Sequence, residues 1–141
     1  MSTMASGGSE LAVNPIEKVD DPSPIRTFFK RRSILITNPH ELWSKLLILK
    51  LLSTCDLMYI FIFFRPSKKA TIREIFEEFC SNSIFSGLRH DLLDKLVPIA
   101  AFPSLPALGL DHGDLKVIVA NVSIVFHSTD GQDIKLNRSL K

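Results

Sequence analysis

The hydrophobic positions are unevenly spaced along the chain, and the longest apolar run is LLILKLLSTCDLMYIFIFF at residues 46–64. Its polar interruption at 53–56 predicts a helix over about 40–52 and a strand over 57–64 that ends at Arg65. Eight consecutive apolar residues are typical of a central strand covered on both faces. This interpretation, which we favour, places the whole run in a folded core.

The same run is also long enough to cross a membrane, because a spanning helix needs about 20 apolar residues. Asp56 and Lys50 oppose insertion, since a central Asp costs about 2.5–3.5 kcal/mol and each Leu, Ile or Phe returns only about 0.3–0.6 kcal/mol. Four basic residues precede the run and four follow it at close range, so charge selects no orientation. The choice rests on Asp56, which marks either a turn between two core elements or the middle of a membrane anchor at 46–64.

Two helices are predicted in the middle of the chain. Thr71 and Glu74 have the spacing of a capping box, and apolar residues at i, i+3, i+4 and i+7 predict a helix over about 71–80. A second helix is predicted after 81–83 and should stop near Pro98; its inner stripe is Ile84, Phe85, Leu88, Leu92 and Leu96. These elements form the expected central helical pair.

The C-terminal part of the sequence predicts strands. Residues 98–114 contain three prolines and two glycines and predict a loop. The β-branched run at 115–127 is typical of a strand, and Asp130-Gly131 favours a tight turn before a second strand at 133–140. The expected fold class is therefore α+β, a small single domain with a C-terminal β-hairpin.

The N-terminal residues 1–24 are rich in Ser, Gly, Pro and acid, and we interpret them as a disordered tail before one domain at 25–141. The following segment, 25–36, predicts either a short strand or an exposed basic anchor. The net charge of +2 argues against nucleic acid as a partner. Two cysteines are too few for a disulfide framework, which favours a reducing, cytoplasmic location, with a membrane as the alternative.

Candidate chemistry is sparse. His90 and Asp94 share a helix face at i,i+4, and with His112 they would give a small metal-dependent hydrolase three candidate ligands. A solvated helix face with Asp91 paired to Lys95 is the favoured interpretation of the first two. The cluster Asp111-His112-Gly113-Asp114 also matches an ordinary turn.

Other reactive side chains receive no role from the sequence. His40 and His127 are interpreted as surface histidines, and Cys80 as a core residue. Neither a P-loop nor the G-x-G-x-x-G fingerprint of dinucleotide-binding folds occurs. We therefore assign no catalytic, cofactor-binding or metal-binding residue and expect no cofactor.

One short segment resembles a known family. Residues 73–89, REIFEEFCSNSIFSGLR, are similar to the cytoplasmic segment before the first membrane helix of epithelial sodium channel and degenerin subunits. The His-Gly pair that functions in that family is Ser86-Gly87 here, and the following residues are not a spanning helix. No residue role is carried over from this resemblance.

The leading functional interpretation is a non-enzymatic protein-interaction module or a small subunit of a larger assembly, with a protein partner. The first alternative is a single-pass or membrane-attached protein anchored by 46–64, and the second is the small metal-dependent hydrolase. A reading frame without selected activity is the remaining interpretation.

Overall fold

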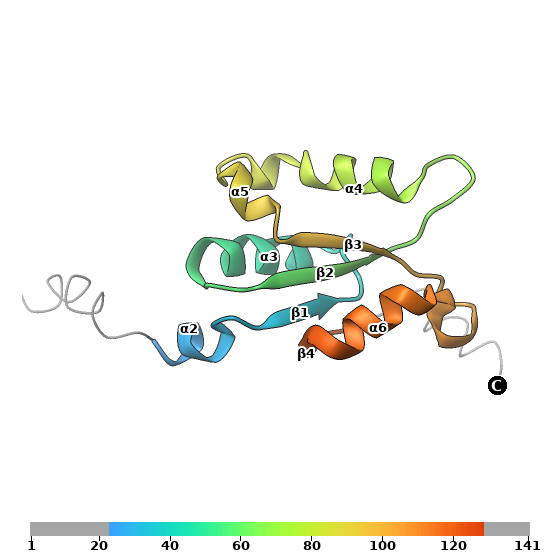
Figure 1. Ribbon diagram of the computed structural model, residues 1–141. Helices are drawn as coiled ribbons and strands as arrows, with labels where there is room; N and C mark the ends of the chain where they lie inside the picture. Colours follow the sequence, from blue (N-terminus) through green and yellow to red (C-terminus); the bar gives the residue numbers. More distant parts are fainter. Residues whose placement is uncertain (1–22, 129–141) are drawn as a thin grey trace, which may run out of the picture.

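The computed structural model of the protein describes residues 23–128, which form one sheet flanked by helices (Figure 1). The sheet has four strands in the order β3-β2-β1-β4, and every neighbouring pair is parallel. The strands are β1 (Ser33–Ile36), β2 (Tyr59–Phe64), β3 (Leu96–Ala100) and β4 (Val122–Phe126). The helices are α2 (Pro24–Phe29), α3 (Leu42–Thr54), α4 (Ile72–Cys80), η2 (Ser83–Phe85), α5 (His90–Leu93), η3 (Pro106–Gly109) and α6 (His112–Asn121).

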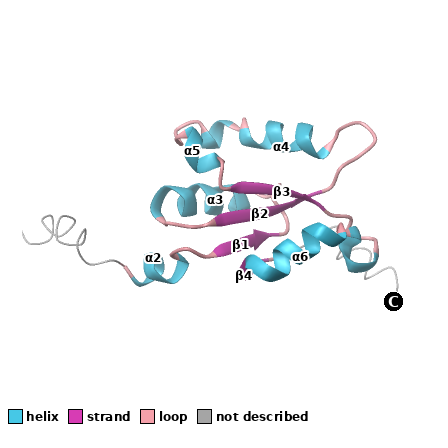
Figure 2. Ribbon diagram, viewed as in Figure 1, coloured by secondary structure: helices cyan, strands magenta, loops and turns pink. Residues whose placement is uncertain are grey.

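Successive strand residues alternate between two hydrophobic cores, one on each face of the sheet. Ile34 and Ile36 of β1 belong to the larger core, which packs against α3, α4 and α5. Leu35 of β1 belongs to the smaller core, together with Ile118 of α6. The result is three layers, with helices on both faces of a parallel sheet (Figure 2). The predicted α+β class was wrong, and the architecture is α/β.

The C-terminal hairpin was also wrong, because the fold is a Rossmann-like parallel sheet in which β4 pairs in parallel with β1. Residues 115–121 lie in α6, although their β-branched composition predicted a strand. Asp111 begins that helix by accepting hydrogen bonds from the backbone N–H groups of Gly113 and Asp114, at 2.9 and 3.4 Å. Packing of Ile118 on the sheet therefore overrides local propensity. The predicted turn at 130–131 and second strand at 133–140 lie outside the described residues.

The first helix of the predicted central pair is confirmed, and the second was wrong. Helix α4 has the expected capping box between Thr71 and Glu74. The predicted second helix is divided into η2, the short α5 and the edge strand β3, which contains Pro98. Lys95 and Ala101 bond through their backbones to β2, so alternation turns the backbone nitrogen of Pro98 away from β2. A proline is tolerated there because no strand hydrogen bond is lost.

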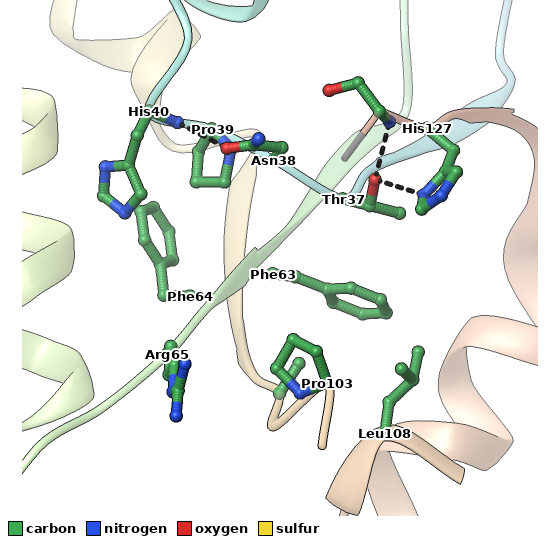
Figure 3. A pocket seen from close by; sticks show the side chains of 12 residues that line it. Thr37, Asn38, Pro39, His40, Phe63, Phe64, Arg65, Pro103, Leu108 and His127 are labelled. Carbon is green, nitrogen blue, oxygen red and sulfur yellow. Dashed lines mark hydrogen bonds between the residues drawn. The ribbon is translucent and has the colours of Figure 1, made fainter. Parts of the chain in front are cut away.

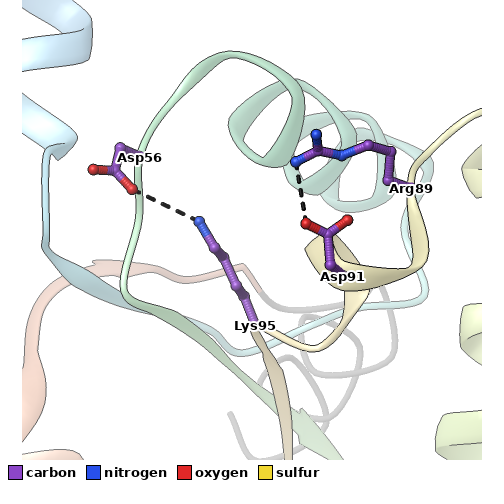
Figure 4. A network of polar contacts seen from close by, with 4 residues as sticks. All are labelled: Asp56, Arg89, Asp91 and Lys95. Carbon is purple, nitrogen blue, oxygen red and sulfur yellow. Dashed lines mark hydrogen bonds and ion pairs between the residues drawn. The ribbon is translucent and has the colours of Figure 1, made fainter.

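The apolar run at 46–64 forms two core elements, as the favoured interpretation predicted. Helix α3 ends at Thr54, β2 begins at Tyr59, and Asp56 lies in the exposed connection. Its carboxylate lies 3.8 Å from Lys95 Nζ (Figure 4). Among residues 23–128, no helix is both long and apolar enough to cross a membrane.

The N-terminal predictions have mixed outcomes. The segment at 25–36 contains most of α2 and all of β1, so the predicted short strand is confirmed for its last four residues. Ser23 caps α2 by accepting a hydrogen bond from Arg26 N at 3.1 Å. Most of the tail assigned to 1–24 lies outside the described residues.

Replacing Asp56 by Leu should change the free energy of unfolding by less than about 1 kcal/mol, because Asp56 is exposed and its ion pair with the partly exposed Lys95 is loosely spaced. Ile60→Ala, in the fully buried part of β2, should cost about 2–5 kcal/mol and is the control. Urea unfolding measures both. A loss of several kcal/mol in Asp56→Leu would show that Asp56 has a structural role beyond a surface turn.

Thr71→Ala should destabilise the protein by about 1 kcal/mol, because it removes the side-chain acceptor of the capping box. The backbone and side-chain hydrogen bonds from Thr71 also lower the pKa of Glu74. Their contribution to the free energy of unfolding is lost as pH falls through that lowered pKa, because the Glu74 carboxylate becomes protonated. Thr71→Ser is the matched control. Urea unfolding at neutral and acid pH should show a smaller difference between the two variants in acid.

Candidate functional site

The carboxyl ends of all four strands lie at one edge of the sheet, because the strands are parallel. On one side of β1 the sheet continues with β2 and then β3, in chain order. On the other side of β1 lies β4. The strand order therefore reverses between β1 and β4. In open α/β sheets, ligands bind in the crevice outside the carboxyl ends of the strands at such a reversal.

A cavity of about 320 Å³ lies at this edge (Figure 3). Residues that follow or end each of the four strands line it, together with the loop after β3. Its polar lining is Thr37, Asn38, His40, Arg65, His127 and Ser128, and its apolar lining is Pro39, Phe63, Phe64, Ala101, Pro103 and Leu108. A few polar groups on largely apolar walls are typical of small-molecule sites.

The apolar wall is rigid where β2 ends. Phe64 is fully buried, and its ring makes edge contacts with Phe76 and Phe79 of α4 at centroid distances of 6.0 and 5.3 Å. The imidazole of His40 lies against the same ring, at 6.2 Å between centroids. Phe63 enters the opposite core, so the end of β2 is anchored on both faces of the sheet.

Polar contacts connect the ends of β1 and β4 across the reversal point. Thr37 N donates to the carbonyl oxygen of Phe126 at 3.1 Å, and Thr37 Oγ1 lies 2.8 Å from His127 Nδ1. Ser128 N donates to Thr37 Oγ1 at 3.3 Å. Ser128 Oγ is buried and has no hydrogen-bond partner within residues 23–128. A buried hydroxyl in a cavity wall is available to a polar ligand.

The rim of the cavity includes a strained loop. Ala107, Leu108 and Gly109 have positive φ angles of 51°, 58° and 60°. A non-glycine residue in this region costs on the order of 1–2 kcal/mol. Leu108 nevertheless lines the cavity and is partly exposed there.

Charge at the cavity comes from Arg65, which directly follows β2 and is exposed. His40 and His127 also line the cavity, and the pKa of His40 is shifted. Desolvation, followed by the positive charge of Lys45, lowers the pKa of its imidazole, and Glu78 partly opposes this effect. His40 is therefore neutral at pH 7, and Arg65 supplies the fixed positive charge.

The candidate residues chosen from the sequence lie elsewhere. His90 and Asp94 lie at α5, and His112 begins α6 on the other face of the sheet. In the described part of the chain, no three His, Cys, Asp or Glu side chains gather to hold a metal ion. Asp91 pairs with Arg89 at 3.1 Å rather than with Lys95 (Figure 4).

The two cysteines lie in or beside the larger core. Cys55 is buried and Cys80 is half-buried. Burial raises the pKa of the Cys80 thiol to about 11, which leaves little thiolate at neutral pH. This agrees with the interpretation of Cys80 as a core residue.

The residues that line the cavity were missed by sequence reasoning. His40 and His127 were treated as isolated surface residues, and Arg65 only as the end of a strand. The available signal was a charged or polar residue directly after β1, β2 and β4, namely Thr37, Arg65 and His127, which matters once the strands are known to be parallel.

Comparison with known families matches residues 43–138, more than half of the chain, to an NAD-binding family described as "Male sterility protein". The chain belongs to this family. The match begins at Trp43, in the first turn of α3.

Named relatives share this part of the sequence. The chain is 27% identical over 116 residues to "Fatty acyl-CoA reductase wat" of Drosophila melanogaster, covering 80% of this chain and 22% of the relative. It is 26% identical over 121 residues to human "Fatty acyl-CoA reductase 1", covering 83% of this chain and 23% of the relative. The chain therefore spans less than a quarter of the length of these relatives.

A solved structure supports the fold. The terminal R domain from the myxalamid PKS-NRPS biosynthetic pathway matches with a TM-score of 0.56 and 23% identity, over 70% of this chain and 25% of that one. The shared fold is a Rossmann-like parallel sheet with helices on both faces.

Membership of the family overturns the prediction of a non-enzymatic interaction module or assembly subunit, because its named relatives are reductases. The alternative of a small metal-dependent hydrolase is wrong for the same reason. The alternative of a membrane anchor at 46–64 is wrong because that run forms helix α3 and strand β2. The resemblance of residues 73–89 to sodium channel subunits is likewise superseded, since this segment lies within the family match.

The NAD-binding family implies a dinucleotide as ligand. Its adenosine end fits the described residues, whereas its pyrophosphate does not. The apolar walls and Arg65 suit an adenine ring and a phosphate on its ribose. Rossmann folds receive the pyrophosphate on a glycine-rich turn between the first strand and helix. The corresponding turn here, TNPHELWS at 37–44, contains no glycine and does not fit that group.

The lowered pKa of His40 predicts a pH-dependent stability. The folded state binds a proton at His40 less readily than the unfolded state does. The contribution of neutral His40 to the free energy of unfolding is therefore present above the ordinary pKa of 6.5 and is lost as pH falls through the lowered pKa. His40→Gln should therefore lose less unfolding free energy than wild type between about pH 7 and pH 5. Urea unfolding tests this, with His90→Gln on the exposed α5 as control. Equal losses in wild type and His40→Gln would contradict it.

Proposed function

We propose that the chain binds the ribose-phosphorylated adenosine of a nucleotide in this cavity, as the nucleotide-binding part of a reductase of the fatty acyl-CoA reductase type. The observation that carries the proposal is the position of the cavity. It lies at the carboxyl ends of the strands, beside the point where the strand order reverses.

Arg65 directs the proposal towards a phosphorylated ribose. In dinucleotide-binding folds, an acidic residue near the end of the second strand binds the ribose hydroxyls, whereas an arginine there accommodates a phosphate. β2 ends at Phe64, and the next residue is Arg65. A guanidinium pairs with phosphate through two parallel N–H donors, which gives the contact geometric specificity.

Two ligands of a fatty acyl-CoA reductase carry this chemistry. NADP has a phosphate on the 2′ position of its adenosine ribose, and coenzyme A has one on the 3′ position. The family is described as NAD-binding, and the relatives' names include acyl-CoA. The shared ligand feature is the ribose-phosphorylated adenosine, and the position of the phosphate distinguishes the two sources.

The proposal for this chain ends at nucleotide binding. Reduction of a fatty acyl thioester is named for relatives that are more than four times as long as the matched segment. We extend it to this chain only as the activity of a complete reductase to which the cavity would contribute. A cytoplasmic location and a protein partner remain predictions from the sequence.

NMR titration of the full chain with adenosine, adenosine 2′-phosphate and adenosine 3′-phosphate tests the proposal. Arg65→Ala should weaken binding of the preferred phosphate by about five- to tenfold, because it removes a charge-assisted contact at an exposed site. It should leave adenosine binding unchanged. Lys69→Ala, in the exposed loop after β2, is the matched control.

The position of the phosphate identifies the ligand source. Preference for the 2′-phosphate would indicate an NADP-type ligand, and preference for the 3′-phosphate a coenzyme A-type ligand. Equal binding of adenosine and both phosphates, or absence of binding, would contradict the proposed function.

A further inference from the structure

The turn between β1 and α3 is filled by side chains at the place where a Rossmann fold needs glycine. In such folds the first glycine permits the tight turn, the second lets the pyrophosphate approach the backbone, and the third allows close packing of helix on strand. The turn of this chain has Asn38, Pro39, His40, Glu41 and, inside the helix, Ser44.

These side chains bond to one another and to the turn itself. Asn38 Oδ1 accepts from the backbone N–H of His40 at 3.3 Å, and Asn38 Nδ2 donates to Glu41 Oε1 at 3.4 Å. Ser44 is fully buried, and its hydroxyl donates to the carbonyl oxygen of Asn38 at 2.5 Å. The turn thus satisfies its polar groups internally.

A negative charge is fixed at the start of α3. Glu41 is the N-cap residue, and its side chain makes no capping hydrogen bond. Instead, Glu41 Oε2 accepts from Trp43 Nε1 at 2.7 Å, and its other oxygen accepts from Asn38. The carboxylate therefore has a fixed position beside the helix N-terminus, where a Rossmann fold places its phosphates. A phosphate bound at the N-terminus of α3 would therefore be repelled by the negative charge of Glu41.

The crevice beside this turn is also bridged. Thr37 is hydrogen-bonded to the backbone of Phe126 and contacts His127 Nδ1, so the ends of β1 and β4 are connected at the reversal point. The remaining cavity of about 320 Å³ lies at the low end of the roughly 300–1,000 Å³ range of ligand pockets. This volume suits a mononucleotide better than a dinucleotide.

We infer that the β1–α3 turn is closed to the pyrophosphate of a dinucleotide, so that the cavity holds a single nucleoside phosphate. This inference rests on the proposed function and concerns the same site. It separates the chain from a standard Rossmann fold: the adenosine end binds, and the second half of a dinucleotide adds nothing to the affinity.

The test compares adenosine 2′-phosphate with NADP, which contains the same group plus the pyrophosphate and the second nucleoside. NMR titration of the wild-type chain should give dissociation constants within about threefold of each other. Adenosine 3′-phosphate and coenzyme A form the equivalent pair if the 3′-phosphate is preferred. In either pair, the larger ligand should have no advantage.

Two variants should reopen the turn. Glu41→Gln removes the charge and keeps the shape, and should tighten binding of the larger ligand by about three- to tenfold without affecting the smaller one. Asn38→Gly/Glu41→Gly/Ser44→Gly removes the whole side-chain network and should give a larger gain of the same kind. Asp91→Gln, on the exposed α5, controls for the loss of a negative charge elsewhere. If the triple variant does not fold, Glu41→Gln still decides the question.

The outcomes distinguish the inference from the proposed function. A wild-type preference of tenfold or more for the larger ligand would overturn the closed turn and leave the proposed function intact. Absence of a gain in Glu41→Gln would likewise overturn the closed turn. Failure of the wild-type chain to bind any of the four ligands would overturn the proposed function itself.

Discussion

Parallel pairing of four short strands is the constraint on which the rest of the structure depends. Parallel neighbours cannot be joined by a tight turn, so each connection must cross a face of the sheet, and each carries at least one helix. These crossovers bury both faces, which is why Ile60, Phe61 and Ile62 of β2 are all buried although successive residues point in opposite directions. The same pairing brings the ends of β1, β2 and β4 together at one edge.

The edge combines features of a nucleotide site with a turn that departs from the usual design. The cavity, Arg65 and the anchored ring of Phe64 are positioned by the sheet and therefore follow from the fold. The turn after β1 is set by local chemistry, in which Asn38, Glu41 and Ser44 replace the backbone access that glycine would give. The sheet that forms the cavity and the turn after β1 are therefore determined by different residues of this chain.

The sequence predicted the elements that have strong local signals. Asp56 correctly marked the turn within the apolar run, and the capping box at Thr71 correctly marked the start of α4. It failed where tertiary packing decided the outcome: the β-branched stretch of α6 is helical, with Ile118 packed on the sheet, and Pro98 lies in a strand because that strand is at an edge. The site was not predicted, since its residues come from distant parts of the chain and the glycine fingerprint that identifies the fold is absent. The strand at 57–64 was predicted, but β3 was assigned to a helix and a loop, so the alternation of strands and helices was not recognised.

The proline in β3 gives the two sides of the sheet different capacities for growth. At that side, Leu96, Pro98 and Ala100 of β3 face outward, and the central one, Pro98, has no N–H to donate to an added strand. β4, at the opposite side, contains no proline, and Val125 on it is 55% exposed. Within residues 23–128, addition of a further strand is therefore favoured beside β4. The two margins of the sheet therefore differ in the number of hydrogen bonds that they can offer to an added strand.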